Sequence, residues 1–368
     1  SMEEGSPGEG SPSAACGGAA MSRPVHAVPP PVLPLLRRLL TDINRRSASG
    51  SEDLLKFEEL PDLALVLSPD VVQDSRKLAQ LQRQLTMVLH QYFKARWPAA
   101  KPNWSAEEQA RGLDRPTGNR TLDGHLLDLS AVGVPYMNAA TIPGLPPSTV
   151  SYIATQHPLP RTVGDFWRMV LSVQPCAIVM LNGAVAAEDP ADIPEYWNPS
   201  ALPEDGLTLT AAPEAERHEE AADCDIRSLR CTLGDLHWSG PHLAVAWWRD
   251  QSEPPMDKFL ALESLLDSVL RAQGGLRSTV LTHCAGGIGR TGVFIAADCG
   301  ARAAMLDADP ARCSPDSLVG HLRACRMNMV QTAEQYEFLH RVLPPLTAQL
   351  KALRSEGAAT SAGSGSLT

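Results

Sequence analysis

One ten-residue segment places a cysteine, an arginine and several glycines at a spacing that suits phosphate chemistry. It reads His283-Cys284-Ala285-Gly286-Gly287-Ile288-Gly289-Arg290-Thr291-Gly292. Glycines let a backbone curl, so that successive N–H groups converge on one anion; here they would be those of Ala285, Gly286, Gly287, Ile288 and Gly289. An arginine at the end of such a turn can bind two phosphate oxygens at once. The segment therefore predicts a phosphate-binding loop that begins at a cysteine.

Cys284 is the candidate nucleophile of this loop. Backbone N–H groups, the guanidinium of Arg290 and a helix N-terminus all stabilise a thiolate, and such surroundings lower cysteine pKa values to roughly 3.5–7.5. Thr291 can donate its hydroxyl to the sulfur, and His283 can hold the loop by hydrogen bonds. The alternative, a buried cysteine in an ordinary glycine turn, leaves six identities at fixed spacing unexplained. We therefore expect nucleophilic catalysis by Cys284.

The loop resembles the signature His-Cys-x-x-Gly-x-x-Arg-Ser/Thr-Gly of the cysteine-based protein tyrosine phosphatases. The similarity covers roughly residues 52–350 and is greatest to the phosphotyrosine-specific branch rather than the dual-specificity one. Residues 136–139 (Tyr-Met-Asn-Ala), 152–169 and 329–336 (Met-Val-Gln-Thr-Ala-Glu-Gln-Tyr) also carry it. The resemblance implies an α/β (α+β) fold, in which helices flank a twisted mixed sheet and the active-site loop joins a strand to a helix.

The resemblance also assigns a general acid and a water-positioning residue. The family carries its acid on a Trp-Pro-Asp loop, and residues 248–250 here read Trp-Arg-Asp. The separation between Asp250 and Cys284, 284 − 250 = 34 residues, is also similar to that of the family. Asp250 would protonate the departing phenolate. Gln331 would orient the water that hydrolyses the phosphocysteine, and Gln335 would bind phosphate or water beside it.

Substrate recognition is where the sequence departs from the family. The family's phosphotyrosine loop reads Lys-Asn-Arg-Tyr-x-Asp, whereas residues 118–123 read Gly-Asn-Arg-Thr-Leu-Asp. Asp123 can still accept a substrate backbone N–H, but Thr121 offers no aromatic wall to the substrate ring. Gln251 stands where the family usually has a residue on the other face of that ring. Arg249 replaces the proline of the acid loop, a change that can alter how the loop opens and closes.

The pattern of apolar residues predicts the elements that position these groups. Short β-rich runs cover 176–181, 207–210, 242–248 and 278–282, and helical spacing covers 75–97, 257–272 and 291–305. We expect residues 52–350 to form the catalytic domain. A Gly/Ser/Pro-rich tail at 1–32 and a tail of small and polar residues at 351–368 are expected to be disordered, while residues 33–51 can form a helical extension.

Composition narrows the functional class. The 368 residues carry 32 Lys+Arg and 42 Asp+Glu, a formal net charge of −10, so the chain lacks the basic footprint of a nucleic-acid-binding protein. Neither a membrane span nor a secretory signal is evident, which predicts a cytoplasmic protein. The phosphocysteine mechanism implied by the resemblance uses no metal and no cofactor. The sequence predicts no particular oligomeric state.

The eight cysteines lie at irregular spacing and predict no disulfide framework. Cys224 and Cys231, with His218 and His237 nearby, are conceivable zinc ligands. Their spacing fits no closed tetrahedral site, so we expect these cysteines to be structural.

These observations predict a phosphatase that acts on phosphotyrosyl proteins through a phosphocysteine intermediate. Two alternatives stay open. Thr121 makes a broader substrate range credible, one that includes phosphoserine and phosphothreonine or phosphoinositides. The changes at Arg249, Thr121 and Gln251 together favour a weakly active domain that binds phosphotyrosine, although such domains usually lack the acid or the cysteine, and both are present here.

Overall fold

A computed structural model describes residues 124–182, 194–211, 217–272 and 279–364, together with Arg76 and Thr121. Its centre is an eight-stranded sheet with the order β1-β2-β8-β3-β7-β6-β4, and β5 pairs with β6. The strands are β1 (Ala139–Ile142), β2 (Ser151–Gln156), β3 (Ala177–Met180), β4 (Thr208–Ala211), β5 (Arg217–Glu219), β6 (Cys224–Leu233), β7 (Leu236–Val245) and β8 (Thr279–Cys284).

The middle of this sheet is parallel and its outer parts are antiparallel. β8 pairs in parallel with β2 on one side and β3 on the other, and β3 pairs in parallel with β7. β1 and the group of β4, β5 and β6 add antiparallel edges. The carboxyl ends of parallel strands meet at one edge of a sheet, where ligands of open α/β sheets bind. Cys284, the last residue of β8, lies at that edge opposite Gln156 of β2.

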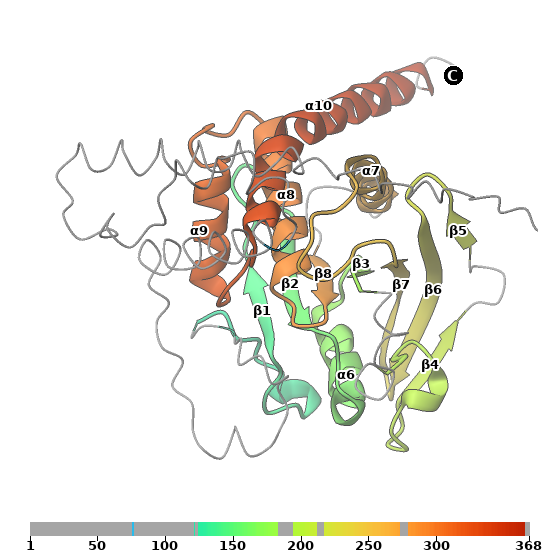
Figure 1. Ribbon diagram of the computed structural model, residues 1–368. Coiled ribbons are helices and arrows are strands. Elements are labelled where there is room, and N and C mark those ends of the chain that lie inside the picture. Colours follow the sequence, from blue (N-terminus) through green and yellow to red (C-terminus); the bar gives the residue numbers. More distant parts are fainter. Residues whose placement is uncertain are drawn as a thin grey trace, which may run out of the picture.

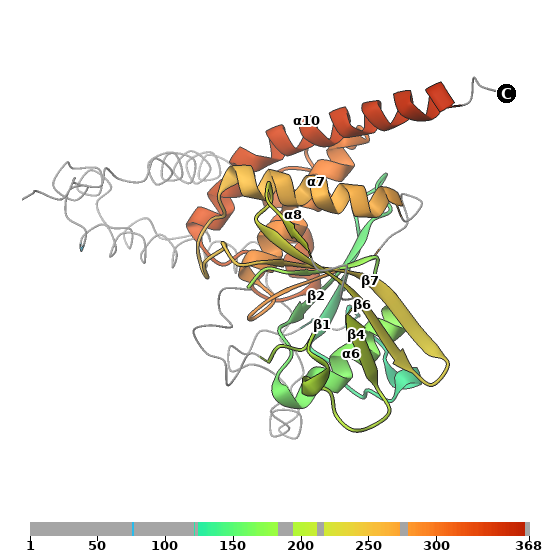
Figure 2. The ribbon, with the colours of Figure 1, turned by 90° about the vertical axis from the view of Figure 1, so that its right-hand side faces the viewer.

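Helices cover both faces of the sheet (Figures 1 and 2). α6 (Val163–Val173) packs on one face, and α7 (Met256–Ala272), α8 (Gly289–Met305), α9 (Pro315–Cys325) and α10 (Ala333–Ser364) lie on the other. Short 3-10 turns span Ser130–Val132, Pro160–Thr162 and Pro199–Ala201. Alternate residues of each central strand enter the two apolar cores, as Val280 and Leu281 of β8 do, because successive strand side chains point to opposite faces.

Most of the predicted elements that fall within the described residues are confirmed. β3, β4, β8, α7 and α8 lie within one or two residues of the predicted runs. The predicted run at 242–248 is the end of β7, which stops at Val245, so residues 246–248 belong to the following loop. The predicted helix at 75–97 lies outside the described residues except for Arg76, which is helical. The expected tail at 1–32 and extension at 33–51 lie outside them altogether.

The C-terminal region differs from the prediction, because α10 continues to Ser364 and residues 351–364 are helical rather than disordered. Apolar residues at helical spacing extend the packing of this helix: Leu350 is buried and Leu353 packs against the same core. Arg271 of α7 also donates a hydrogen bond to the Leu353 carbonyl at 3.0 Å. The sequence of the last turns is that of a polar tail. These turns are helical because they continue a helix whose earlier turns pack on the core.

A buried ion-pair network joins the two helices that follow the candidate loops. Arg302 of α8 lies 2.9 Å from Asp267 of α7 and 2.6 Å from Asp298 of its own helix. Tyr152 of β2 donates a hydrogen bond to Asp298 at 2.9 Å. Moving α7 away from α8 would break the buried pair between Arg302 and Asp267, which is the contact that crosses between the helices, while Arg302 would stay paired with Asp298 on α8. The pair thus holds α7, which follows the acid loop (residues 248–253), to α8, which follows the phosphate loop.

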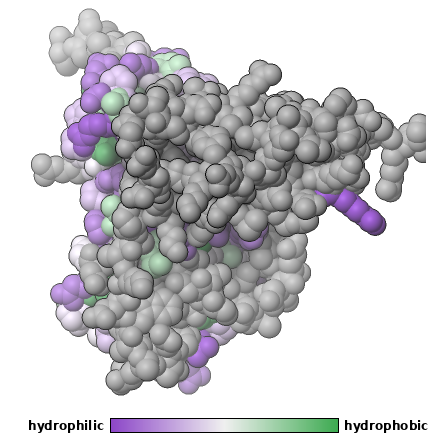
Figure 3. Space-filling model, turned by 60° about the vertical axis from the view of Figure 1, so that its left-hand side comes forward, coloured by the Kyte–Doolittle hydropathy of each residue, from purple (hydrophilic) through white to green (hydrophobic). Residues whose placement is uncertain are grey.

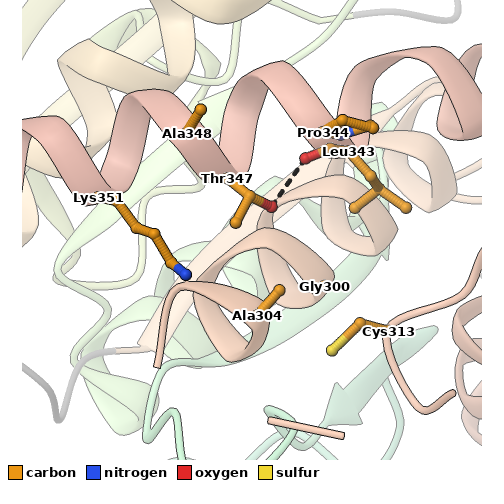
Figure 4. A pocket seen from close by; sticks show the side chains of 8 residues that line it. All are labelled: Gly300, Ala304, Cys313, Leu343, Pro344, Thr347, Ala348 and Lys351. Atoms are coloured by element: carbon orange, nitrogen blue, oxygen red, sulfur yellow. Dashed lines mark hydrogen bonds between the residues drawn. The ribbon is translucent and has the colours of Figure 1, made fainter. Parts of the chain in front are cut away.

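Where described residues are visible in Figure 3, hydrophilic residues predominate and apolar ones form small separate spots. Among the described residues, the large apolar side chains that are exposed are Leu126 and Leu236. A cavity of about 390 Å³ opens between α8 and α10, where Cys313 and Lys351 line its wall (Figure 4). It includes none of the predicted site residues. Gly300, another of its lining residues, is eleven residues beyond the start of α8, or about 16 Å along the helix.

Candidate active site

The predicted phosphate loop lies between the carboxyl end of β8 and the first turn of α8. Its start is fixed by β2, because the backbone N–H of His157 donates to the carbonyls of Cys284 at 2.9 Å and Ala285 at 3.0 Å. Gly287 has a φ of +67°, and a Cβ there would lie 2.1 Å from the Thr155 carbonyl oxygen. The close approach and the left-handed backbone both require glycine at this position. Strand β2 therefore fixes the path of the loop.

Arg326 holds the loop from its outer side. This side chain is buried, and its Nε and Nη2 donate to the carbonyls of Gly287 at 2.8 Å and Gly286 at 3.1 Å. Its Nη1 donates to Asn138 Oδ1 at 2.7 Å. In a trans peptide the C=O and N–H groups point in opposite directions. Turning the carbonyls of Gly286 and Gly287 outward therefore turns the next two N–H groups, those of Gly287 and Ile288, toward the inside.

Cys284 is buried at the base of this loop and has a lowered pKa. Burial by itself raises the pKa of the thiol, because a thiolate is poorly solvated inside a protein. The positive charge of Arg290, the hydroxyl of Thr291 and the backbone N–H groups of Thr291 and Ile288 together outweigh burial and lower the pKa. Thr291 Oγ1 is buried and makes no other hydrogen bond within the described residues. The surroundings therefore favour the thiolate.

Other cysteines show what burial does without such compensation. Burial raises the pKa to about 12 for Cys224, Cys231, Cys299 and Cys325. Cys284 is thus chemically distinct from these four thiols.

Arg290 connects the phosphate loop to the acid loop. Its guanidinium is buried, and Nη1 donates to the carbonyl oxygen of Trp248 at 2.8 Å. Nη2 lies 3.1 Å from Asp250 Oδ1, and Nε makes no hydrogen bond within the described part of the chain. A buried guanidinium with unused donors can donate hydrogen bonds to two oxygens of a phosphate. Asp250, whose side chain is 55% exposed, faces the same guanidinium from the solvent side.

The acid loop keeps its shape through short-range hydrogen bonds. Trp248 is buried and its Nε1 donates to the Ser252 carbonyl at 2.9 Å, while Ser252 Oγ donates to the Arg249 carbonyl at 2.9 Å. Gln251 lies at the turn between them with a φ of +56° and is exposed. Arg249 is exposed as well, so its charge stays in solvent.

Gln331 and Gln335 approach the loop from the start of α10. The backbone N–H of Val330 donates to the Ile288 carbonyl at 3.0 Å, which ties this segment to the phosphate loop. A Cβ at Gly289 would lie 2.4 Å from Gln331 Oε1 and 3.2 Å from Gln335 Nε2. Both amides therefore rest on the loop. Gln335 Oε1 also accepts the Gln331 backbone N–H at 2.9 Å, which fixes the turn that presents Gln331.

His283 is buried behind the loop in a cluster of rings. Tyr196 Oη lies 2.6 Å from His283 Nε2 and 2.7 Å from His242 Nε2. Burial lowers the pKa of His242 to about 3, so its ring is neutral. Because His242 Nδ1 is buried without a hydrogen bond in the described residues, we assign its proton to Nε2, which donates to Tyr196. Tyr196 then donates to His283 Nε2, and His283 Nδ1–H faces the Cys284 carbonyl at 3.4 Å.

Comparison with known proteins identifies the family. The family model described as protein-tyrosine phosphatase matches residues 116–344, more than half of the 368-residue chain. The chain belongs to the protein-tyrosine phosphatase family. This agrees with the resemblance found in the sequence.

Two curated relatives and two solved structures support this membership. The chain is 32% identical over 226 residues to tyrosine-protein phosphatase non-receptor type 5 of Mus musculus, which covers 60% of this chain and 39% of that relative. It is 33% identical over 224 residues to tyrosine-protein phosphatase non-receptor type 7 of Homo sapiens, covering 58% and 57%. The chain thus spans well under two thirds of the length of these relatives.

The first of the two solved structures is described as "Structural basis of PTPN18 fingerprint on distinct HER2 tyrosine phosphorylation sites". It matches with a TM-score of 0.60 and 26% identity over 72% of this chain and 92% of that one. The protein tyrosine phosphatase TcPTP1 of Trypanosoma cruzi matches with a TM-score of 0.58 and 18% identity over 73% and 93%, a similarity of fold. The expected fold class is confirmed. None of the helices in the described ranges has the length and hydropathy needed to cross a bilayer.

Within this phosphatase-family domain, the structure brings most of the predicted site residues together. Cys284, Arg290, Thr291, His283, Asp250, Gln331 and Gln335 all lie in or against the phosphate loop. Thr121 also reaches the site, but it is 7% exposed and its Oγ1 accepts a hydrogen bond from Arg326 at 3.1 Å. Its oxygen therefore already accepts one hydrogen bond within the protein. Asp123 lies outside the described residues.

The sequence analysis missed the groups that support the loop from behind, namely Arg326, Asn138, Tyr196 and His242. A signal existed for two of them, since Asn138 lies within a segment matched to the family and Arg326 stands three residues before another.

The fold excludes a zinc site that contains both Cys224 and Cys231. Cys224 and Cys231 are seven residues apart on β6 and enter the apolar cores on opposite faces of the sheet. They cannot share a metal ion. Elsewhere in the described ranges, three or more His, Cys, Asp or Glu side chains are nowhere grouped so that they could hold a metal.

Proposed function

We propose that this chain is a protein tyrosine phosphatase that hydrolyses phosphotyrosyl proteins through a phosphocysteine intermediate. One observation carries the proposal: a buried cysteine with a lowered pKa shares its loop with an arginine whose guanidinium has unused donors and faces a carboxylic acid. A thiolate, an anion-binding guanidinium and an acid are the three groups that phosphate transfer to sulfur requires.

In the first step the Cys284 sulfur attacks phosphorus and the bond from phosphorus to the tyrosine oxygen breaks. Loop N–H groups and Arg290 bind the phosphate oxygens, and Asp250 gives its proton to the leaving oxygen. In the second step a water placed by Gln331 attacks the phosphocysteine, Asp250 takes a proton from that water, and the sulfur leaves as a thiolate. The Thr291 hydroxyl stabilises this thiolate, as it does in the free protein.

Two features support a working enzyme and a phosphotyrosine substrate. Asp250 reaches Arg290 although Arg249 replaces the family's proline, so the substitution still allows the acid to approach the loop. A structural neighbour, "PTPN18 in complex with HER2-pY1196 phosphor-peptides", matches with a TM-score of 0.60 and 26% identity. The cytoplasmic location stays a prediction.

The experiment is a turnover assay with a phosphotyrosyl peptide in the presence of EDTA. We expect the unaltered protein to release phosphate, and Cys284→Ser to release none while its urea unfolding midpoint is retained, because a serine hydroxyl is not ionised in this site. Asp250→Ala should lower kcat by about 10²-fold or more. Substantial phosphate release by Cys284→Ser, or loss of wild-type activity in EDTA that added metal restores, would contradict the mechanism.

A broader substrate range is favoured by the position of Thr121. Its buried side chain supplies no aromatic wall to a substrate, and its oxygen already accepts a hydrogen bond from Arg326. The test is the ratio of kcat/KM for matched phosphotyrosyl and phosphothreonyl peptides. A ratio near one would indicate a broad enzyme, and a ratio of several hundred would indicate that other side chains select the tyrosine ring.

A further inference from the structure

The acid loop has a second attachment, made three residues beyond Asp250 and away from the phosphate loop. Glu253 pairs with Arg341 Nη2 of α10, and their side chains are 31% and 38% exposed. The Arg341 guanidinium carbon also lies 5.7 Å from the ring centre of Phe338, so this side chain is held in place on the helix surface. The pair therefore joins the acid loop to α10.

The surroundings of Glu253 make it dependent on this partner. Its pKa is raised by burial above all and further by the charge of Glu334, while the charge of Arg341 opposes both effects. Without Arg341 the Glu253 carboxylate would remain partly buried beside a like charge. Moving such a carboxylate into solvent lowers the free energy. The move would carry this end of the acid loop with it.

The same part of α10 also contacts Gln331 and the acid loop through Gln335. Gln335, six residues before Arg341, fixes the turn that presents Gln331, and its Nε2 approaches the Ser252 carbonyl at 3.5 Å. Ser252 in turn accepts the Trp248 indole N–H. The residue before Asp250 is Arg249, so no proline ring restricts φ there and the position of the loop depends more on contacts of this kind.

We propose that Arg341 is a positioning residue: through Glu253 it holds the acid loop in the arrangement that places Asp250 over Arg290. This inference rests on the proposed function and deepens it. Arg341 touches no reacting atom, so its effect must pass through the proton that Asp250 donates.

The test compares two substrates that differ in their need for that proton. Phenyl phosphate releases a basic phenolate that must be protonated, whereas 2,4-dinitrophenyl phosphate releases a phenolate that leaves without a proton. We expect Arg341→Met to lower kcat/KM for phenyl phosphate roughly two- to fivefold, the range set by a partly exposed ion pair, and to leave kcat/KM for the dinitrophenyl ester unchanged. Asp250→Asn gives the pattern for complete loss of the acid.

Two further variants and a control sharpen the result. Glu253→Gln should have the same effect as Arg341→Met, and the double variant should lose no more than either single one. Exchanging the charges with Glu253→Arg and Arg341→Glu should restore part of the loss. Lys351 lies on the same helix as Arg341 and forms an exposed ion pair with Asp307, so Lys351→Met should change neither rate.

The outcomes separate this inference from the function on which it rests. An equal loss on both substrates would show that the pair only supports the fold, and no loss on either would show that it is silent; each would overturn the inference alone. Failure of the unaltered protein to hydrolyse either ester would overturn the proposed function and this inference with it.

Discussion

Arg326→Met tests whether a buried arginine sets the shape of the phosphate loop. Methionine keeps the unbranched stem of the side chain and removes the guanidinium. The change withdraws hydrogen bonds from four acceptors, the carbonyls of Gly286 and Gly287, Asn138 Oδ1 and Thr121 Oγ1. The fold outside the loop keeps its apolar packing, so the consequences should concentrate on these acceptors.

The expected loss of stability follows from the number of acceptors. Each buried acceptor left without a donor costs about 1–3 kcal/mol, so four would cost about 4–12 kcal/mol if nothing moved. The loop can relax and water can enter, so we expect the lower end of that range, about 4–5 kcal/mol, as for other losses of a buried charge partner. Urea unfolding followed by tryptophan fluorescence measures this as a fall in the midpoint with an unchanged slope.

The thiol gives a second readout that a purely structural role would not move. Once the Gly287 carbonyl is free to turn, the Ile288 N–H no longer has to face the sulfur, and one of the groups that lower the Cys284 pKa is lost. The Cys284 pKa should therefore rise. Iodoacetate alkylation measured against pH reports it, because other buried thiols with pKa values of about 12 stay protonated in the same range.

Arg323→Met is the matched control. Arg323 lies one helical turn earlier and donates to the carbonyls of Met329 and Val330, each at 2.8 Å, so its loss should also destabilise the protein. Its acceptors belong to the segment before Gln331 rather than to the phosphate loop, so the pH dependence of alkylation should stay as in the unaltered protein. Equal thiol titrations in the two variants would refute the idea that Arg326 orients the loop amides.

Three further predictions concern neighbouring groups. Thr291→Val should raise the Cys284 pKa; since activity requires the thiolate and is lost as pH falls through that pKa, the acidic limb of kcat/KM should move to higher pH. Gly289→Ala places a Cβ 2.4 Å from Gln331 Oε1, too close for the two atoms to coexist, so it should displace that amide and slow phosphocysteine hydrolysis, seen as a burst of phenol release followed by a slow phase. Tyr196→Phe leaves His283 and His242 without their shared partner and should cost about 1–3 kcal/mol in urea unfolding.

The sequence revealed the parts of the site whose geometry is local. Cys284, Arg290 and Thr291 lie within one turn and the start of one helix, so their spacing along the chain determines their spacing in space. Asp250 lies 34 residues before Cys284 in the sequence, and only the similarity of this separation to that of a known family made it a candidate. Without that comparison it looks like an ordinary exposed acid in a loop.

The supporting groups could not be read in the same way. Arg326 ends α9 and in sequence looks like an ordinary basic residue near a helix terminus. Its role depends on a contact with a loop 326 − 287 = 39 residues earlier, which no local pattern records. The same holds for the hydrogen bond that Thr121 Oγ1 accepts from Arg326, which joins residues 326 − 121 = 205 positions apart in the chain.

The site is assembled by arginines that bind backbone carbonyls. Arg290 holds the acid loop at Trp248, Arg323 holds the segment before Gln331, and Arg326 holds the phosphate loop. A guanidinium presents several N–H donors in one plane, so it can bind two carbonyls at once and fix the relative orientation of their peptide units. An ammonium group has no such plane. Lysine at these positions would keep the charge but release the peptide orientations, and through them the N–H groups that face the thiolate. Rigid loops and a stabilised thiolate therefore have a common physical origin in this domain, and a substitution that alters one should alter the other.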